Sequence, residues 1–362
     1  MTLAPDITDL LARARADLRM GVPIIVGTQA GLLVLAVESL GPDRLRDVIA
    51  LGGDVDLVLT GRRAATLKAR AYDGDVARVA LPDDASLRWV QAVADPSDDL
   101  SHPMKGPLVT RRGGDPTLHR LAVTLAKSAR LLPAVVARDV QDAKTFAAEH
   151  DLTLIDPVVA APRLGASAVF DSVVSARVPL RAAQNARLHV FRPEDGSEEH
   201  YVIEIGRPDR AKPVLARLHS ACFTGDLLGS LKCDCGPQLN GALAAMGGEG
   251  EGVLLYLNQE GRGIGLANKM RAYALQDQGF DTVEANHRLG FEDDERDFRI
   301  GAELLRKLGF GSVRLMTNNP AKIAMMEKQG ITVAERVSLK VGENPHNKAY
   351  LATKARKSGH LL

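Results

Sequence analysis

The stretch that decides the fold begins with PVLARLHS at residues 213–220 and continues as ACFTGDLLGSLKCDCG at 221–236. Its first part is a short apolar run that predicts a buried strand. QLNGALAAMGG at 238–248 then predicts a helix that ends in glycines, and VLLYL at 253–257 predicts a second buried strand. This part of the chain therefore predicts a strand, a loop that carries cysteines, a helix and a strand.

The first half of the chain alternates helical and extended patterns in the same way. Residues 6–20 have helical periodicity that stops at Gly21, and PIIVG at 23–27 predicts a buried strand. Further helices are predicted at 43–51, 61–71, 117–131 and 142–150, and further strands at 55–60, 134–140 and 153–159. The predicted fold class is α/β (α+β), with two domains that are each a mixed sheet packed with helices.

Length and charge limit the classes of function. A chain of 362 residues suggests two domains, which we place at 1–185 and 186–362 with a junction around 175–195. The formal net charge of +1 argues against binding of nucleic-acid polymers but leaves room for a nucleotide. The most apolar stretch, 22–37, is shorter than a membrane span, and residues 1–20 lack the pattern of a signal peptide. We therefore expect a cytoplasmic protein without a membrane partner.

All three cysteines fall within fourteen residues, as Cys222, Cys233 and Cys235. An odd number argues against a disulfide framework, and the clustering argues against three unrelated buried thiols. Zinc favours thiolate ligands, and three protein ligands leave a fourth position for a water molecule. His219 and Asp234 lie close enough in sequence to supply a fourth ligand, so both a catalytic and a structural zinc site stay open.

Two later segments carry groups suited to a nucleotide. In NQEGRGIGL at 258–266, the glycines allow close backbone approach, a carboxylate at Glu260 can accept from a guanine-type N–H edge, and Arg262 can bind phosphate. A polar surface turn is the alternative. In SVRLMTNNPAKIAMMEKQG, a strand runs into a helix that Asn319 would cap, which is a natural phosphate site with Lys322 in its first turn.

The acidic run at 292–297 is typical of a solvated helix start, with Arg296 as its functional hint. In the first half, His102 and His119 are isolated, and the aspartates at 95, 98 and 99 are typical of a solvated loop. We find no phosphate-binding glycine motif in the first half.

VDLVLTGRRAATL, TRRGGDPTLHRLAVTLAKSARLLPAVVARDV and FAAEHDLTLI occur in the order found in 3,4-dihydroxy-2-butanone 4-phosphate synthases, which the first domain resembles. The acid-rich loop that supplies that family's metal ligands and catalytic carboxylates is missing, because GTQAGLLVLAVESL follows PIIV. Only His119 remains of a Gly-His-Thr-Glu segment. We predict a degenerate domain without synthase activity and with a structural or dimerising role.

Residues 205–362 resemble GTP cyclohydrolase II. HSACFTGDLLGSLKCDCG, NQEGRGIGLANKMRAYALQDQGFDTVEANHRLGF, DERDF and TNNPAK occur in the order and spacing of that family. The resemblance implies an enzyme, a hydrolase acting on cyclic amidine C–N bonds, that opens riboflavin biosynthesis. It would convert GTP in a zinc-dependent reaction to 2,5-diamino-6-(5-phosphoribosylamino)pyrimidin-4(3H)-one, formate and pyrophosphate.

The resemblance also implies roles for residues. The three cysteines would hold one Zn²⁺ per chain, Tyr273 would assist beside the zinc, and Asp294 would accept a proton. Arg296 would be the nucleophile at the α-phosphorus, with electrostatic stabilisation of the departing pyrophosphate as its alternative role. Mg²⁺ would accompany the GTP phosphates, and a homodimer is expected. The GTP-binding positions would be Arg217, Leu218, His219, Ser220, Ala221, Gln238, Glu260, Gly261, Arg262, Thr282, Thr317 and Lys322.

Two positions depart from the family pattern. Ala221 stands where the family usually has Glu, and Asn258 stands where it often has Arg. These departures keep open a GTP-binding regulatory protein with a structural zinc. A bifunctional enzyme that also makes 3,4-dihydroxy-2-butanone 4-phosphate is the third hypothesis, which the missing acidic loop disfavours.

Overall fold

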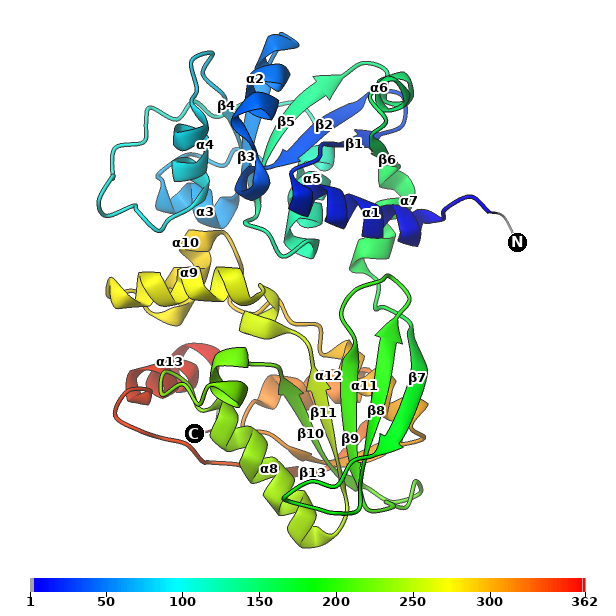
Figure 1. Ribbon diagram of the computed structural model, residues 1–362. Coiled ribbons are helices and arrows are strands. Elements are labelled where there is room, and N and C mark those ends of the chain that lie inside the picture. Colours follow the sequence, from blue (N-terminus) through cyan, green and yellow to red (C-terminus); the bar gives the residue numbers. More distant parts are fainter. Residues whose placement is uncertain (1–2, 360, 362) are drawn as a thin grey trace. The chain divides into compact units, whose positions relative to one another are not determined.

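The computed structural model describes residues 3–359 and 361 and contains two separate mixed sheets (Figure 1). Contacts group the chain into two units. The first unit is Met1–Ala166 with Ala267–Glu295, and the second unit is Ser167–Leu266 with Arg296–Leu362. The predicted fold class, two mixed sheets each packed with helices, is confirmed.

The sheet of the first unit has six strands in the order β4-β3-β5-β2-β1-β6. β1 pairs with β6 in parallel, and the other neighbours are antiparallel. The strands are β1 (Ile24–Gly27), β2 (Gly31–Ala36), β3 (Val55–Thr60), β4 (Val76–Ala80), β5 (Ala134–Val140) and β6 (Thr153–Ile155). The helical elements are α1 (Ile7–Met20), η1 (Val37–Ser39), α2 (Pro42–Ala50), α3 (Gly61–Thr66), α4 (Leu87–Ala94), α5 (Thr117–Ser128), α6 (Ala143–Glu149), α7 (Pro157–Gly165), α9 (Leu266–Asp277) and α10 (Thr282–Leu289).

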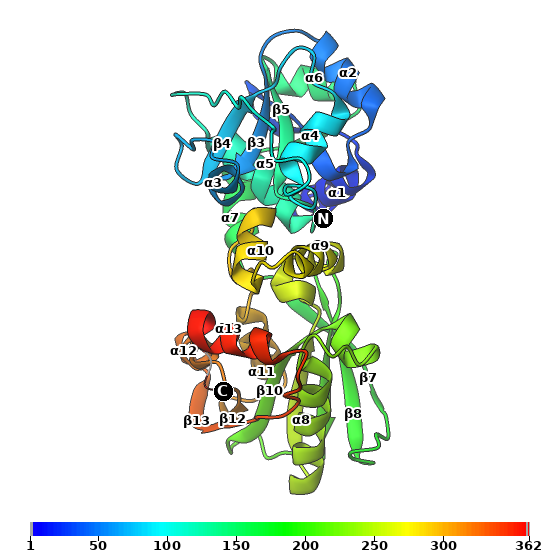
Figure 2. The same cartoon turned by 90° about the vertical axis from the view of Figure 1, so that its left-hand side faces the viewer.

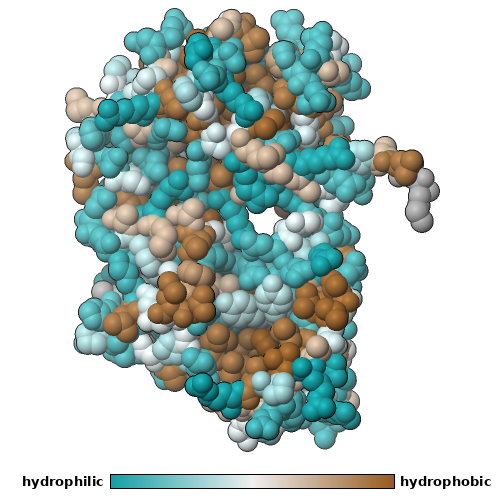
Figure 3. Space-filling view, in the orientation of Figure 1, coloured by the Kyte–Doolittle hydropathy of each residue, from teal (hydrophilic) through white to brown (hydrophobic). Residues whose placement is uncertain are grey.

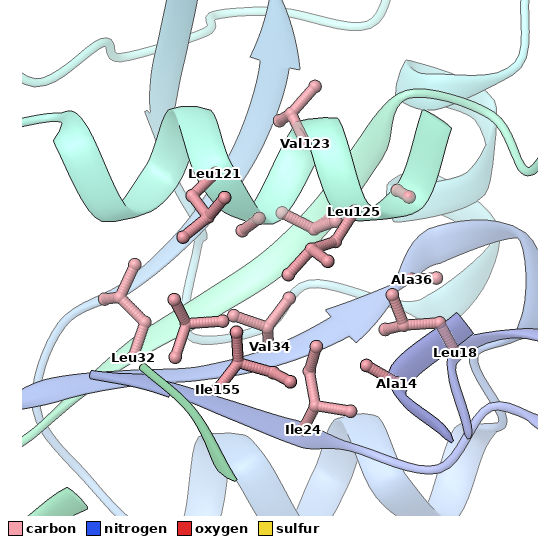
Figure 4. Close-up of a cluster of buried hydrophobic side chains, with 14 of the residues drawn as sticks. Ala14, Leu18, Ile24, Leu32, Val34, Ala36, Leu121, Val123, Leu125 and Ile155 are labelled. Carbon is pink, nitrogen blue, oxygen red and sulfur yellow. The ribbon is translucent and has the colours of Figure 1, made fainter. Parts of the chain in front are cut away.

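Successive side chains along the strands of this sheet belong to two different hydrophobic cores, one on each face of the sheet. Val34 of β2 belongs to a cluster with Leu18 of α1 and Leu125 of α5, and Figure 4 shows these side chains directed toward one another. Its neighbour Leu35 belongs to a second cluster with residues of α2, α4 and α6. Because successive strand residues point to opposite faces, the sheet is covered by helices on both sides.

The sheet of the second unit has seven strands in the order β13-β12-β10-β11-β9-β8-β7. β10 is parallel to β11 and to β12, and β12 is parallel to β13, whereas β9, β8 and β7 pair antiparallel. The strands are β7 (Phe170–Arg177), β8 (Ala186–Pro193), β9 (His200–Ile205), β10 (Val214–Ser220), β11 (Gly252–Leu257), β12 (Ser312–Met316) and β13 (Thr332–Val337). The helical elements are η2 (Phe223–Leu227), α8 (Cys235–Glu249), η3 (Glu260–Gly263), α11 (Arg299–Lys307), α12 (Pro320–Lys328) and α13 (Lys348–Ser358).

Helices also cover both faces of the second sheet (Figures 1 and 2). Met246 of α8 packs in a cluster with Leu215 and Leu254. Leu304 of α11 packs in the opposite cluster with Ala216 and Leu255. The crossovers between the parallel strands therefore run on both sides of the sheet, as parallel pairing requires.

Most predicted elements are present, and four segments differ. The strand expected over 153–159 ends at Ile155, because Pro157 takes the first turn of α7 and Asp156 caps it. The segment around 175–195 is expected from the sequence to join two domains, whereas it holds the end of β7 and the whole of β8, which pair with each other. The helix expected over 61–71 ends at Thr66, and the acidic run at 292–297 is irregular chain ahead of α11.

Within the described residues, no helix combines the length and the apolar character that crossing a membrane requires. Polar side chains cover most of the face shown in Figure 3, with smaller apolar areas between them.

Leu125→Ala should lower the free energy of unfolding by about 2–5 kcal/mol, because it opens a cavity in the fully buried cluster of Figure 4. Chemical denaturation followed by circular dichroism measures this change. Leu100→Ala is the matched control, since the Leu100 side chain is exposed, and it should change stability by about 0.5 kcal/mol or less. Equal losses in the two variants would contradict the packing described for α5.

Candidate functional site

The carboxyl ends of three parallel strands gather the polar residues of the second unit. β10, β11 and β12 end at Ser220, Leu257 and Met316, and they are neighbours in the order β12-β10-β11. Parallel neighbours end at the same edge of a sheet, and this edge is where α/β sheets bind ligands. The cysteine loop, the EGRG turn and the start of α12 all follow from these ends.

The three cysteines converge beside the end of β10. Cys222 immediately precedes η2, whereas Cys233 and Cys235 lie at the start of α8. The three sulfur atoms lie within 4.8 Å of one another, and the Sγ atoms of Cys222 and Cys233 are 3.8 Å apart. Cys222 and Cys233 are buried and Cys235 is half-buried. The clustering expected from the sequence is confirmed.

A glycine in η2 makes room for this convergence. A Cβ atom at Gly225 would lie 2.7 Å from the Cys233 sulfur and 3.0 Å from the Cys222 sulfur. Such distances exclude any side chain, so the backbone of η2 forms one wall of a small sulfur-lined space. This close wall is the reason why the TGD segment carries glycine at position 225.

The donor set suits a soft divalent cation. The pKa of the Cys235 thiol is raised well above its usual value, first by hydrogen bonding with Cys222 and Cys233 and then by burial. The pKa of the Cys233 thiol is also raised, first by its hydrogen bond with Cys222. A bound cation would favour the thiolate forms of the ligands. Zinc prefers this set of sulfur ligands. The residues present fit a zinc ion.

The two residues considered as a fourth ligand make other contacts. His219 Nε2 lies 3.0 Å from a carboxylate oxygen of Asp226, and Asp234 accepts a hydrogen bond from Gln238. Among the described residues, the metal-binding group at this place contains only the three cysteines. The geometry therefore favours an open site over a closed one.

Asp226 is a functional residue that the sequence analysis missed. Its carboxylate, 6% exposed, accepts hydrogen bonds of 3.0 Å from the Cys222 backbone N–H and from the Tyr256 hydroxyl. It also faces His219 Nε2, whose pKa is lowered by burial against the opposing effect of Asp226. Asp226 thus holds the first cysteine in place. The available signal was its position four residues after Cys222, within one helical turn.

Arg217 supplies a buried positive charge on β10. Its side chain is 7% exposed, donates to the Met316 carbonyl oxygen at 3.2 Å, and donates to Gln238 Oε1. Its Nε has no hydrogen-bond partner among the described residues. Burial lowers the pKa of Arg217 to about 10, although Asp234, Cys235 and Asp226 act in the opposite direction. The side chain therefore stays protonated near neutral pH, and one of its buried N–H groups has no acceptor among the described residues.

Arg296 and Lys322 come together from separate parts of the chain. Arg296 Nη1 donates to Ser220 Oγ at 3.3 Å, and Lys322 Nζ donates to the Leu218 carbonyl oxygen at 2.9 Å. Both cationic groups face the ring of Phe298, at 4.7 Å and 5.0 Å from its centroid. Two positive charges thus lie beside the end of β10, as an anionic ligand requires.

The turn after β11 is tied to the cysteine loop. Glu260 accepts hydrogen bonds from the backbone N–H groups of Phe223 at 2.6 Å and of Gly261 at 3.0 Å. Gly261 and Arg262 both have left-handed backbone conformations, with φ of 63° and 62°. A non-glycine residue rarely adopts this conformation, and such strain is typical of binding loops.

The turn after β12 leads into α12 as expected. Asn319 Oδ1 accepts from the Ala321 N–H at 3.0 Å and caps the helix, and Pro320 takes its first turn. The buried Thr317 hydroxyl accepts from the Asn319 N–H at 3.0 Å. The predicted cap is confirmed, and it places Lys322 in the first turn.

Three of the predicted site residues belong to the first unit. Tyr273 on α9 has the Lys269 ammonium 5.6 Å from its ring centroid, and Thr282 Oγ1 accepts from Gln276 Nε2 at 3.2 Å. Asp294 is exposed in the chain that leads to Arg296.

The two departures from the family pattern lie in the second unit. The Ala221 N–H donates to the Leu257 carbonyl oxygen, and the Asn258 side chain donates to the Glu199 carbonyl oxygen, ahead of β9.

The expectation of a solvated aspartate loop in the first unit is wrong for two members. Asp99 is 11% exposed and pairs with Arg63 and Lys105. Burial opposes ionisation of Asp99, yet hydrogen bonds from these two cations lower its pKa below the usual range. Asp95 pairs with Arg271 at 3.0 Å. Asp95 lines a cavity of about 690 Å³ together with Glu38, Trp89 and Arg271.

Comparisons with known proteins agree on a family. The family described as GTP cyclohydrolase II matches residues 171–338. GTP cyclohydrolase-2 of Azospirillum brasilense is 46% identical over 358 residues, which cover 97% of this chain and 93% of that protein. GTP cyclohydrolase-2 of Azotobacter vinelandii is 59% identical over 175 residues, which cover 48% of this chain and 84% of that protein.

One solved structure is also similar. The crystal structure of RibBX, a two-domain 3,4-dihydroxy-2-butanone 4-phosphate synthase from A. baumannii, has 18% sequence identity and a TM-score of 0.33. The match covers 91% of this chain and 99% of the RibBX chain, and a TM-score this low does not establish a shared fold. The Azospirillum brasilense protein matches this chain over nearly the whole length of both proteins. The chain therefore belongs to the GTP cyclohydrolase II family.

Proposed function

We propose that the protein hydrolyses GTP to 2,5-diamino-6-(5-phosphoribosylamino)pyrimidin-4(3H)-one, formate and pyrophosphate, the first step of riboflavin biosynthesis. The observation that carries the proposal is the convergence of three cysteine sulfurs at the strand edge that also presents Arg296 and Lys322. A soft metal site can supply hydrolytic Lewis acidity, and a neighbouring anion site can hold the phosphates, so together they suit hydrolysis of a purine nucleotide. Membership of the family supports the same reaction.

Cys222, Cys233 and Cys235 would hold the zinc ion. When bound, zinc supplies Lewis acidity that makes a water molecule nucleophilic near neutral pH. The chain itself fixes the sulfurs, since η2 closes one wall at Gly225 and Asp226 holds the Cys222 backbone. Burial of two cysteines limits solvent access, which strengthens electrostatic interactions in the site.

Arg296, Lys322 and the start of α12 would receive the phosphates. Charge-assisted hydrogen bonds from the two cations would orient the triphosphate, and the helix N-terminus adds a favourable dipole. Mg²⁺ would accompany the phosphates, as the family resemblance implies. Arg296 donates a hydrogen bond to Ser220. A guanidinium group is a poor nucleophile, so stabilisation of the departing pyrophosphate suits Arg296 better than nucleophilic attack.

The remaining predicted residues would complete the site. Glu260 and Arg262 would contact the base and the phosphates from the strained turn, and Arg217 would direct its spare N–H toward the nucleotide. Tyr273 would assist the hydrolytic step and Asp294 would accept a proton. A homodimer and a cytoplasmic location remain predictions from the resemblance and from the sequence.

The first unit offers no support for a second, synthase activity. Thr28, Gln29 and Ala30 join β1 to β2 in a short turn without a carboxylate. A divalent-cation site needs clustered oxygen ligands, which this turn does not supply. We infer that the chain carries the cyclohydrolase activity alone, and incubation with ribulose 5-phosphate tests this by the absence of 3,4-dihydroxy-2-butanone 4-phosphate.

Cys233→Ser should abolish formate release from GTP and lower zinc content, because two sulfurs cannot hold the ion as three do. Ser230→Ala, in the same loop, is the control and should keep both. Formate, pyrophosphate and bound zinc are measured for each protein, with and without a chelator. Zinc-loaded wild-type protein that binds GTP without releasing formate would instead support a regulatory protein with a structural zinc.

Asp226→Asn should weaken zinc affinity by about 10- to 100-fold, because an amide replaces two of the carboxylate's acceptor positions with donors. The Cys222 N–H and the Tyr256 hydroxyl would then lose a shared acceptor. Competition with a chromogenic chelator measures the affinity. Asp209→Asn, which affects a surface pair with Lys212, is the control. Unchanged affinity in Asp226→Asn would remove Asp226 from the metal site.

Lys322→Gln should raise the KM for GTP by about 10- to 100-fold, because a charge-assisted hydrogen bond is worth about 1.5–3 kcal/mol. Lys328→Gln, at the exposed end of the same helix, is the matched control and should leave KM unchanged. Steady-state kinetics of pyrophosphate release measure both variants. Equal KM values in the two would show that α12 does not bind the phosphates.

A further inference from the structure

The part of the chain that matches the GTP cyclohydrolase II family is divided between the two units. The family match spans residues 171–338, yet its internal segment Ala267–Glu295 groups with Met1–Ala166. We call this stretch the α9–α10 segment, because it contains nearly all of α9 and the whole of α10. It also carries Tyr273 and Asp294, which the proposed mechanism uses, and Thr282, a GTP-binding position implied by the family resemblance.

We propose that residues 1–166 act as a scaffold that holds the α9–α10 segment in its working position, and that Arg271 is the main positioning residue. The inference rests on the proposed function, because it assigns Tyr273 and Asp294 a part in GTP hydrolysis. It goes further in giving the synthase-like half of the chain a task in that reaction.

Arg271 ties α9 to two elements of the scaffold. Its Nε donates to Asp95 Oδ2 at 3.0 Å, and its Nη1 lies 3.2 Å from Glu38 Oε2. Asp95 is the C-terminal cap of α4, and Glu38 lies in η1. A guanidinium group can serve two carboxylates at once because its N–H groups form a rigid fork.

The two carboxylates are themselves held. Glu38 accepts from the Leu132 N–H at 2.7 Å. Asp95 accepts from the Ser97 N–H at 2.9 Å and from the Ser97 hydroxyl at 2.6 Å. These bonds limit the freedom of both partners, so the position of Arg271 is well defined within the unit.

The anchors continue along α9. Asn268 is fully buried, donates to the Arg130 carbonyl oxygen at 3.1 Å and accepts from Arg271 at 2.9 Å. Gln278, just after α9, donates to the Ser97 carbonyl oxygen at 2.9 Å. Asn268 and Arg271 are three positions apart and so share one side of the helix, whereas Tyr273 lies about 200° further round from Arg271. The scaffold thus binds one side of α9 and leaves Tyr273 on another.

The second helix of the segment is anchored in the same way. α10 packs against α3, and Gly290 approaches Thr60 so closely that a Cβ atom would lie 2.7 Å from the Thr60 hydroxyl. Glu292 pairs with Arg62 at 2.6 Å, and Glu295 pairs with Lys127 at 2.7 Å. The ion pair between Lys127 and Glu295 holds the backbone at the residue that follows Asp294.

Loss of this anchoring should affect catalysis more than binding. Displacement of a catalytic group by about 1 Å can cost about 100-fold in rate. The cysteines, Arg296 and Lys322 belong to the second unit, and Thr282 is the one predicted GTP-binding position in the segment, so zinc content and KM should change much less than kcat. A fall in kcat with these two quantities preserved is therefore the signature of a positioning role.

The test uses the full-length protein with Arg271→Gln, Glu38→Gln and the double variant. We expect kcat for formate release to fall by about 10- to 100-fold in Arg271→Gln, with KM within about three-fold of wild type. Glu38→Gln should lower kcat less, and the double variant should lose less than the product of the two single losses. Arg271→Lys, which keeps the charge but not the fork, should be intermediate.

Hydrogen exchange supplies a readout that is independent of activity. Amides of α9 should exchange faster in Arg271→Gln, because a helix that loses its anchor opens more often. Arg111→Gln is the matched control, since Arg111 also pairs with two carboxylates of the first unit, Asp54 and Asp56. It should change neither α9 exchange nor kcat.

Three results would contradict the proposal that residues 1–166 position the α9–α10 segment. The first is a kcat within about two-fold of wild type in both Arg271→Gln and Glu38→Gln, and the second is an equal loss in Arg111→Gln. The third is unchanged α9 exchange in Arg271→Gln. If wild-type protein releases no formate, the proposed function fails by itself, and the exchange experiment still decides whether Arg271 anchors α9.

Discussion

Parallel hydrogen bonding of β10 with both β11 and β12 is the constraint on which the site depends. Parallel strands must be joined by crossovers, so each connection leaves from the same edge of the sheet. The cysteine loop, the EGRG turn and the capped start of α12 are the beginnings of those connections. Residues distant in sequence meet there, such as Ser220 at the end of β10 and Arg296 in the long connection from β11 to β12.

Charge balance links the metal site to the buried arginine. Three thiolates and one divalent cation would carry a net charge of −1, which is costly to bury without a partner. Arg217 is a buried cation whose protonated form is already favoured by Asp234, Cys235 and Asp226. Ionisation of the cysteines on metal binding would favour it further. Arg217 would therefore offset the charge of the metal site when zinc is bound.

The sequence was most informative where structure is local. The strand and helix periods, the stop at Gly21, the Asn319 cap and the sulfur cluster depend on residues close together in the chain, and the structure contains them. Features set by tertiary contact were missed. Strands β7 and β8 lack a strong alternating pattern because β7 is largely exposed. The division of the chain into units was also beyond reach, since nothing local in 267–295 reveals that it packs on residues 1–166.

That division gives residues 1–166 a part in the cyclohydrolase proposed for this chain. The α9–α10 segment leaves the second unit after the glycine-rich turn and returns at Arg296, so both crossings adjoin residues of the proposed site. Leu275, Leu289 and Phe291 of the segment are buried in the described structure. Because α10 packs against α3 and the Lys127 ammonium lies over the Phe291 ring, removal of residues 1–166 would expose part of this apolar surface to water, at a cost of about 25 cal/mol per Å².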